Sequence, residues 1–221
     1  MCMNNSMDHG GFGCDGGFGC DGCSNRNVCH TLGPFLAVDA ACITPSVNKG
    51  SIIPFSSGIT TVSLATIAGG VIGVPSLIGF GSAVPGVTIL NNTITLSNII
   101  TEAFVVPRAG NITAISASFS ALANAAVPPV PLAGTTTLRA QVYLAPAGSN
   151  VYTATSVVVD LAPAFSGLLV GSEIAFNSAD VAPFPVTVGD KLLMVFSIAA
   201  TTGVTVAQAI TGTASAGITI E

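Results

Sequence analysis

The chain has 221 residues, of which 50% are hydrophobic and only 7% are charged, and its formal net charge is −5. Globular proteins carry about a quarter charged residues, so hydroxyl groups, small side chains or another subunit must cover most of this surface. Five Lys and Arg residues against ten Asp and Glu residues argue against nucleic acid and anionic membranes as partners, because both attract basic clusters. The composition predicts a protein that assembles.

The first residues, 1–5, contain neither a basic region nor an apolar run, so we expect no secretory signal and synthesis in a cytoplasm. No stretch of about 18 residues is free of Gly, Pro, Ser and Thr, as a membrane-spanning helix would be. We therefore expect no membrane insertion.

Residues 1–49 form a compositionally distinct arm, which we expect to be disordered or extended. A hexapeptide occurs twice in it, at 10–15 and 16–21, and so many glycines cannot build a core of their own. All cysteines of the chain lie in this arm: Cys2, Cys14, Cys20, Cys23, Cys29 and Cys42. The arm is therefore predicted to be a connector, followed by one folded domain over 50–221.

We expect these six cysteines to form disulfide cross-links. Cys14 and Cys20 lie one hexapeptide apart, and such regular spacing suits equivalent bonds to equivalent neighbours. Disulfides are rare in a cytosol but form once a protein meets oxidising surroundings. Metal binding is the minority alternative: Cys20, Cys23, Cys29 and His30, with Cys14 and His9 upstream, offer thiolate and imidazole ligands of the kind that zinc prefers. Free thiols are a further alternative. We expect no resident cofactor.

The segment from residue 50 onwards contains about ten short runs rich in Val, Ile, Thr, Phe and Ala, separated by Gly, Pro and Asn. We expect strands near 51–56, 60–67, 76–81, 87–96 as a hairpin pair, 102–106, 111–120, 136–144, 151–161, 191–199 and 214–220. Short strands at such spacing predict an all-β protein, either a two-sheet sandwich or a jelly roll.

Four patterns indicate where these strands lie. Apolar side chains alternate with polar ones over 115–120 and 138–144, which places one face of each strand on the core. Asn91-Asn92 suits a two-residue hairpin turn, because both residues tolerate positive φ. Residues 192–196 are apolar on both faces, so this strand is either central or covered by a neighbouring subunit. Prolines confine 127–131 and 183–185 to loops or edges.

We expect no catalysis, because 50–221 contains neither His nor Cys and a catalytic triad would have to borrow His9 or His30 from the arm. Calcium binding is a minor alternative for acids that are isolated in sequence: Glu102, Asp160, Glu173, Asp180, Asp190 and Glu221. Arg108 is predicted to lie in a turn, and Arg139 at the surface or in a subunit contact. Three Asn-X-Ser/Thr sequons are attributed to chance.

Six segments in order along the chain resemble the C-terminal domain of the collagen-like exosporium glycoproteins of spore-forming bacilli: 50–58, 66–70, 77–82, 104–113, 192–197 and 214–220. The resemblance implies a jelly roll similar to the tumour-necrosis-factor and complement C1q domains, trimeric and displayed on a spore. With a trimer implied, we expect Leu192, Met194 and Phe196 to contribute to its interface. Residues 1–49 lack the Gly-X-Y stalk of those glycoproteins, and in this the chain is similar to endospore appendage subunits with cysteine-bearing connectors.

We therefore expect a structural, self-assembling subunit of the bacterial spore surface, in an exosporium layer or an appendage fibre. It would form homotrimers through the jelly roll and join neighbours, including other spore-surface proteins, through the arm. The alternative is a trimeric C1q-like head that recognises a surface ligand through its loops. Metal storage or sensing by the arm is a minority hypothesis.

Overall fold

The computed structural model describes residues 50–67, 71–96, 103–122, 132–169, 171, 173–203 and 207–221. Regular structure in these ranges is entirely β: β1 (Ser51–Ser56), β2 (Val62–Ile67), β3 (Val71–Ile72), β4 (Ser76–Ile78), β5 (Ala83–Pro85), β6 (Thr93–Thr95), β7 (Phe104–Val105), β8 (Gly110–Ala121), β9 (Leu132–Ala145), β10 (Val151–Asp160), β11 (Phe165–Gly167), β12 (Ile174–Val186), β13 (Lys191–Thr202) and β14 (Ala209–Ile220). Within the described residues, no helix has the length and apolarity to cross a membrane.

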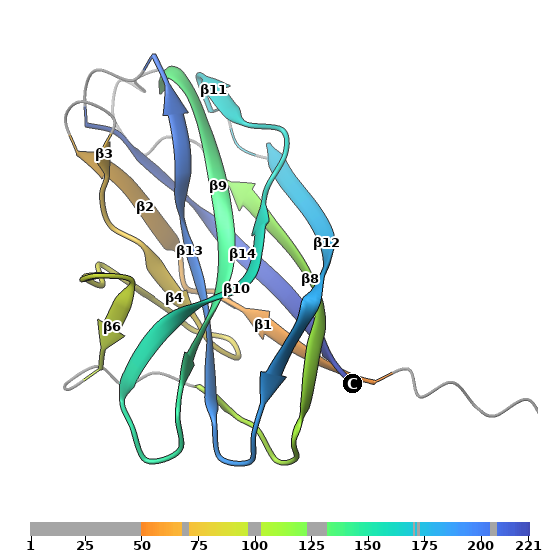
Figure 1. The fold of residues 1–221 in the computed structure, drawn as a ribbon. Coiled ribbons are helices and arrows are strands. Elements are labelled where there is room, and N and C mark those ends of the chain that lie inside the picture. The colour runs from red at the N-terminus through yellow and green to blue at the C-terminus, as the bar shows by residue number, and fades with distance from the viewer. Residues whose placement is uncertain are drawn as a thin grey trace, which may run out of the picture. The chain divides into compact units, whose positions relative to one another are not determined.

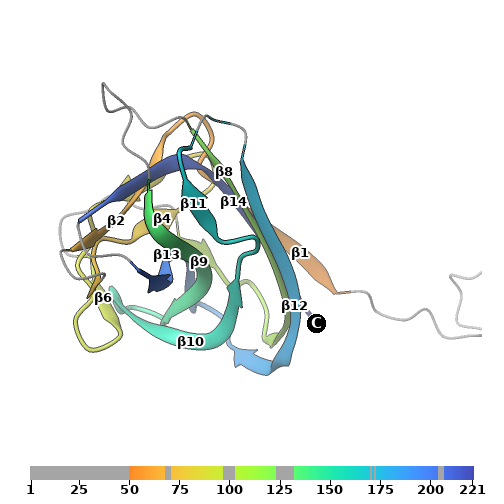
Figure 2. The same cartoon turned by 90° about the horizontal axis from the view of Figure 1, so that it is seen from above.

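The strands form two antiparallel sheets that face each other (Figures 1 and 2). The six-stranded sheet has the order β12-β8-β14-β2-β3, with β1 also paired to β14. The eight-stranded sheet has the order β5-β4-β13-β9-β10-β6, with β11 beside β9 and β7 beside β13. The chain passes repeatedly from one sheet to the other, and the last strand, β14, lies between β2 and β8. This strand order confirms the predicted all-β jelly roll.

The main core lies between the sheets and is built from alternating side chains. Along β8, Ile115, Ala117 and Phe119 are buried while the serines between them are partly exposed, as the period of two predicts. The Phe119 ring lies 6.0 Å from that of Phe165 and 6.5 Å from that of Phe196, centroid to centroid. These aromatic contacts join β8 to β11 and β13 across the sandwich.

A second apolar cluster covers part of the outer face of the eight-stranded sheet. Leu193 and Val195 of β13 pack there with Tyr143, Tyr152 and other residues of the same chain. Neighbouring side chains in the cluster come from the segment around β6, including Val87, Ile94 and Leu96. Strand β13 is therefore central and buried on both faces, which explains its uninterrupted apolar sequence.

This arrangement corrects the expected trimer interface. Leu192, Met194 and Phe196 point into the main core, and each is 0% exposed in the single chain. Side chains without accessible surface have nothing to offer a second subunit. Residues 192–196 are apolar on both faces because the second cluster packs against the outer one. The local pattern alone did not reveal that cluster. Any subunit interface must use other residues.

The predicted hairpin turn is present. Asn91 and Asn92 have φ values of 50° and 60°, and Leu90 and Thr93 exchange two backbone hydrogen bonds of 2.9 Å each. Only Thr93–Thr95 on its far side forms a strand.

The structure contains one long strand that the sequence did not predict, β12 over Ile174–Val186, where Pro183 and Pro185 lie. The structure places both prolines in β12, an edge strand, in accord with the loop-or-edge prediction. Arg108 lies in the bend before β8, as predicted, and donates to the Ser51 hydroxyl over 3.1 Å. Residues 127–131 lie outside the described part.

Candidate functional site

The outer face of the six-stranded sheet carries small and hydroxyl side chains across four strands. We call it the small-residue face. Strand register aligns its residues in ranks: one rank runs from Ser56 through Ser215 and Ser118 to Phe176, the next from Pro54 through Gly217 and Ser116 to Ser178, and the third from Ile52 through Thr219 and Ala114 to Asp180.

The serines of this face arise directly from the alternation in β8 and β14. Residues between the buried Ile115, Ala117 and Phe119 must point outward, and these positions hold Ser116 and Ser118. The Ser118 and Ser215 hydroxyls lie 2.9 Å apart and hydrogen-bond across the two strands.

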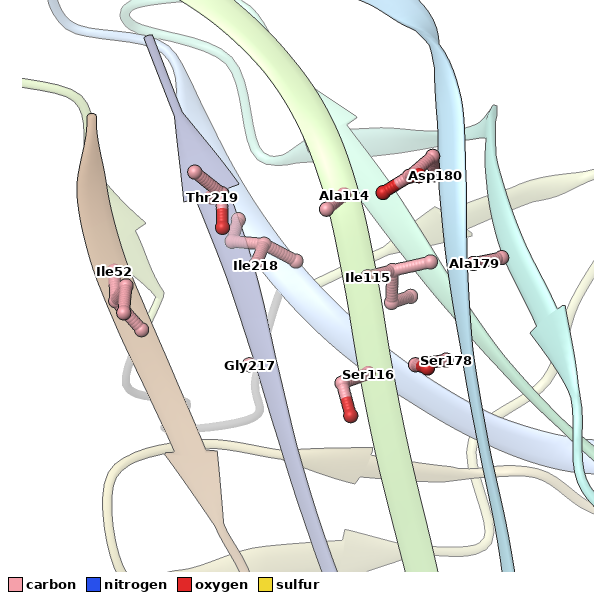
Figure 3. A pocket seen from close by; sticks show the side chains of 10 residues that line it. All are labelled: Ile52, Ala114, Ile115, Ser116, Ser178, Ala179, Asp180, Gly217, Ile218 and Thr219. Atoms are coloured by element: carbon pink, nitrogen blue, oxygen red, sulfur yellow. The ribbon is translucent and has the colours of Figure 1, made fainter. Parts of the chain in front are cut away.

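The face is hollowed rather than convex. A shallow depression of about 320 Å³ crosses β1, β14, β8 and β12 (Figure 3). A second depression of about 410 Å³ shares Ser116 and Gly217 with the first, so the two are continuous. The hollow follows from the sequence, because Ser, Ala and Gly side chains leave the backbone close to the surface.

Larger apolar side chains border the small-residue face on two sides. Ile52 on β1 is 75% exposed, and Ile174 and Phe176 on β12 are 56% and 54% exposed. Among the residues aligned in the three ranks, Asp180 has the only charged side chain. The face therefore combines a hydroxyl-lined hollow with apolar rims, and nearly all of it can be covered without desolvating a charge.

The opposite sheet carries the one ion pair found among the described residues. Arg139 on β9 binds Asp160 on β10 through a fork of two hydrogen bonds, 2.6 Å from Nε and 3.0 Å from Nη2. Hydrogen bonding to Asp160 is the main cause that raises the pKa of Arg139 above its ordinary value, and burial opposes it. The sequence predicts a position at the surface or in a subunit contact for Arg139. The side chain is partly exposed, and its pairing with Asp160 was not predicted.

The other predicted acids are dispersed. The Asp190 carboxylate accepts hydrogen bonds from the Thr187 backbone N–H over 2.7 Å and from its hydroxyl over 3.0 Å, which closes the turn before β13. Over the ranges that the structure describes, no group of three or more His, Cys, Asp or Glu side chains could hold a metal ion. Glu102, the six cysteines, His9 and His30 lie outside those ranges.

The chain is similar in sequence to part of a collagen-like protein. The chain is 28% identical over 199 residues to "Collagen-like protein 1" of Acanthamoeba polyphaga mimivirus; the match covers 80% of this chain and 19% of that protein. The chain thus spans about a fifth of the relative's length. No family model matches.

Two solved structures align over most of this chain. The Eiger TNF of S. frugiperda has 10% sequence identity and a TM-score of 0.36, and the alignment covers 78% of this chain and 93% of that one. Infectious bursal disease virus, Gx strain, has 11% identity and a TM-score of 0.34, with 84% and 36% covered. The assignment of the fold rests on the strand order described above.

Proposed function

We propose that this protein is a structural subunit of the bacterial spore surface, which forms homotrimers through the small-residue face and joins neighbouring subunits through the cysteines of residues 1–49. The observation that carries the proposal is the small-residue face itself: a broad, hollow, nearly uncharged surface with exposed apolar rims. Monomeric proteins rarely leave such a surface to water.

The face suits close packing of one sheet against another subunit. Small side chains at Ser116, Gly217 and Ala114 allow backbones to approach closely, while Phe176 or Ile52 of a neighbour can fill the hollow. Burying the exposed apolar side chains of the rims contributes about 25 cal/mol for each Å² of apolar surface removed from water, before association costs.

Two other observations support the proposed trimer and the proposed spore location. The resemblance to collagen-like exosporium glycoproteins supports both, and the similarity to a collagen-like protein supports an assembled, structural role. The cysteine-bearing arm supports linkage between assembled units in an exosporium layer or an appendage fibre.

The test is analytical ultracentrifugation of the full chain under reducing conditions, which leaves only non-covalent contacts. The chain should sediment as a trimer, and Ser116→Arg should dissociate it, because the new guanidinium would have to be buried in the hollow without a partner. Ser166→Arg, on an exposed position of β11, is the matched control and should remain trimeric. A wild-type monomer at micromolar concentration, or a trimeric Ser116→Arg variant, would contradict the proposal.

A recognition head is the second candidate function. A polar cleft on the opposite sheet favours it.

A further inference from the structure

A half-enclosed cleft of about 500 Å³ lies over the outer face of the eight-stranded sheet. Its floor includes Arg139 and Gln141 of β9 and Ser197 of β13, and its walls include Val87 and Ile89 from the segment that precedes the Asn91-Asn92 turn. A volume between about 300 and 1,000 Å³ is typical of small-molecule sites. The cleft is thus large enough for a small organic ligand.

Three adjacent strands place polar groups in one line, and two of these groups, Arg139 and Ser197, line the cleft. Asp160 of β10 pairs with Arg139 of β9, and Arg139 pairs with Ser197 of β13. The line of carboxylate, guanidinium and hydroxyl is therefore set by sheet register, and side chains held by a rigid sheet lose little freedom when a ligand binds.

Each of these floor residues lines the cleft and has hydrogen-bonding groups that it does not use within the described part of the chain. Arg139 uses Nε and Nη2 for the Asp160 fork, which leaves the donors of Nη1. Gln141 donates from Nε2 to the Thr155 carbonyl over 2.7 Å, so its orientation is held and its Oε1 acceptor remains. Ser197 adds a hydroxyl that both donates and accepts. The floor presents donors and acceptors side by side.

The charge at the floor is balanced. Asp160 lies at hydrogen-bond distance from Arg139 and neutralises its charge. The carboxylate would therefore repel an anionic ligand, and the guanidinium would repel a cationic one. A neutral ligand with several adjacent hydroxyls meets neither penalty, because each hydroxyl can donate to one group and accept from another. Val87 and Ile89 provide an apolar wall for the C–H face of such a ligand.

From this geometry we propose that the cleft binds a neutral carbohydrate, as a single sugar or the end of a glycan. The cleft lies on the sheet opposite the small-residue face, so the inference does not rest on the proposed assembly. Failure of one proposal leaves the other standing, because sugar binding and sedimentation are separate measurements on separate surfaces.

The test is ligand-observed NMR with the full chain, using methyl glucoside, methyl galactoside and N-acetylglucosamine as probes and acetate as the anionic probe. Arg139→Met removes the Nη1 donors, and Ser197→Ala removes the hydroxyl with minimal change in packing. Arg108→Met is the matched control, because Arg108 is an exposed arginine on the other side of the sandwich. Circular dichroism establishes that each variant is folded.

At least one sugar should show saturation transfer at concentrations up to about 50 mM, within the weak range expected for a single sugar. Binding should fall by about tenfold or more in Arg139→Met and in Ser197→Ala, since each leaves ligand hydroxyls without a partner, and should be unchanged in Arg108→Met. Absence of transfer from all three sugars would overturn the proposal, as would binding that both cleft variants retain, or binding of acetate alone.

Discussion

Arg139 and Asp160 lie opposite each other on β9 and β10 because β10 contains an irregularity between Ala154 and Val158. Near the hairpin turn, Leu144 pairs with Thr153 and Tyr143 with Ala154. Continued without interruption, this register would place Val158 opposite Arg139. The bulge shifts the pairing by two residues, and Asp160 takes that place.

Thr155 holds this bulge together, so its hydroxyl should matter for stability. It donates to the Val142 carbonyl over 2.7 Å and accepts from the Val157 N–H over 3.1 Å, in a buried position. Thr155→Val should lower the free energy of unfolding by about 1–3 kcal/mol, because buried partners lose their hydrogen bonds. Thr153→Val, at an exposed position of β10, is the control and should change it by less than about 0.5 kcal/mol. Equal effects in denaturant titrations would show that the bulge does not depend on this hydroxyl.

The same bulge shows what local sequence could and could not predict. Alternation in β8 and the Asn91-Asn92 pair predicted a buried face and a turn correctly, because both depend on neighbouring residues alone. The pairing of Arg139 with Asp160 depends on two extra residues within a strand. The second apolar cluster depends on a distant segment folding over β13. Neither leaves a periodic signal, so the ion pair and the polar cleft were not predicted. For residues 192–196 the sequence left two alternatives open, and the structure shows the central strand.

The small-residue face was partly visible in the sequence. The outward serines of 116–120 were predicted to lie on one face, but their alignment with Ser215 and Gly217 requires the long-range pairing of β8 with β14. Strand β12, which supplies Phe176, was not expected at all. Its prolines are compatible with a strand only because it lies at the sheet edge.

Because Met194 is buried in the core, its substitution should affect the stability of the fold and leave assembly to residues at the surface. Met194→Ala should lower the free energy of unfolding by about 2–5 kcal/mol, because it opens a cavity in the main core. Phe176→Ala removes a side chain that is 54% exposed, so it should leave the stability of the dissociated subunit almost unchanged while weakening trimer formation. Denaturant unfolding at low protein concentration and sedimentation measure the two properties separately. If Met194→Ala weakened trimer formation and Phe176→Ala lowered the free energy of unfolding, β13 would again be the candidate interface.

Substitution by alanine should lower the stability of the fold at one glycine of β14 and leave it unchanged at another. A Cβ atom at Gly212 would meet the Ser120 carbonyl oxygen and the Phe119 ring at van der Waals overlap. Gly212→Ala should therefore cost about 1–3 kcal/mol of stability, as overpacked cores do. At Gly217 the nearest atom to an added Cβ is the Ile53 carbonyl oxygen at 3.9 Å, so Gly217→Ala should fold normally. Thermal unfolding of both variants, compared at one concentration, checks this contrast.

The two tyrosines predict a loss of stability in alkali. Burial raises the pKa of both Tyr143 and Tyr152. The folded protein therefore holds these phenol protons more tightly than the unfolded chain, and the stability that this confers is complete below the unfolded pKa of about 10. It should decline as the pH rises through the folded pKa values.

Unfolding midpoints measured between about pH 8 and 11.5 should show this decline, which begins near the unfolded pKa. The chain has only two tyrosines, so the double variant Tyr143→Phe/Tyr152→Phe removes the whole contribution and should flatten the profile. An equally steep decline in the double variant would assign it to other groups.

Covalent linkage through residues 1–49 is tested by electrophoresis. Oxidised native protein should give a ladder of multimers that collapses with reductant, and the variant with Cys14, Cys20 and Cys23 changed to Ser should lose most of it. Reductant should also lower resistance to heat, because the cross-links restrict the unfolded chain. A single monomer band from oxidised protein would exclude covalent linkage, and stoichiometric zinc in the same protein would favour the metal alternative.

The start of β1 and the end of β14 are neighbours in one ladder, where Ser51 pairs with Ile220. Gly50 and Glu221 can therefore be joined by a short peptide, and the ring reopened in the exposed turn at Ala147-Gly148, without disturbing either sheet. In such a circular permutant the arm would leave the domain from a different point. If fibres or layers require the arm to emerge beside β14, the permutant should fold and trimerise yet fail to build them.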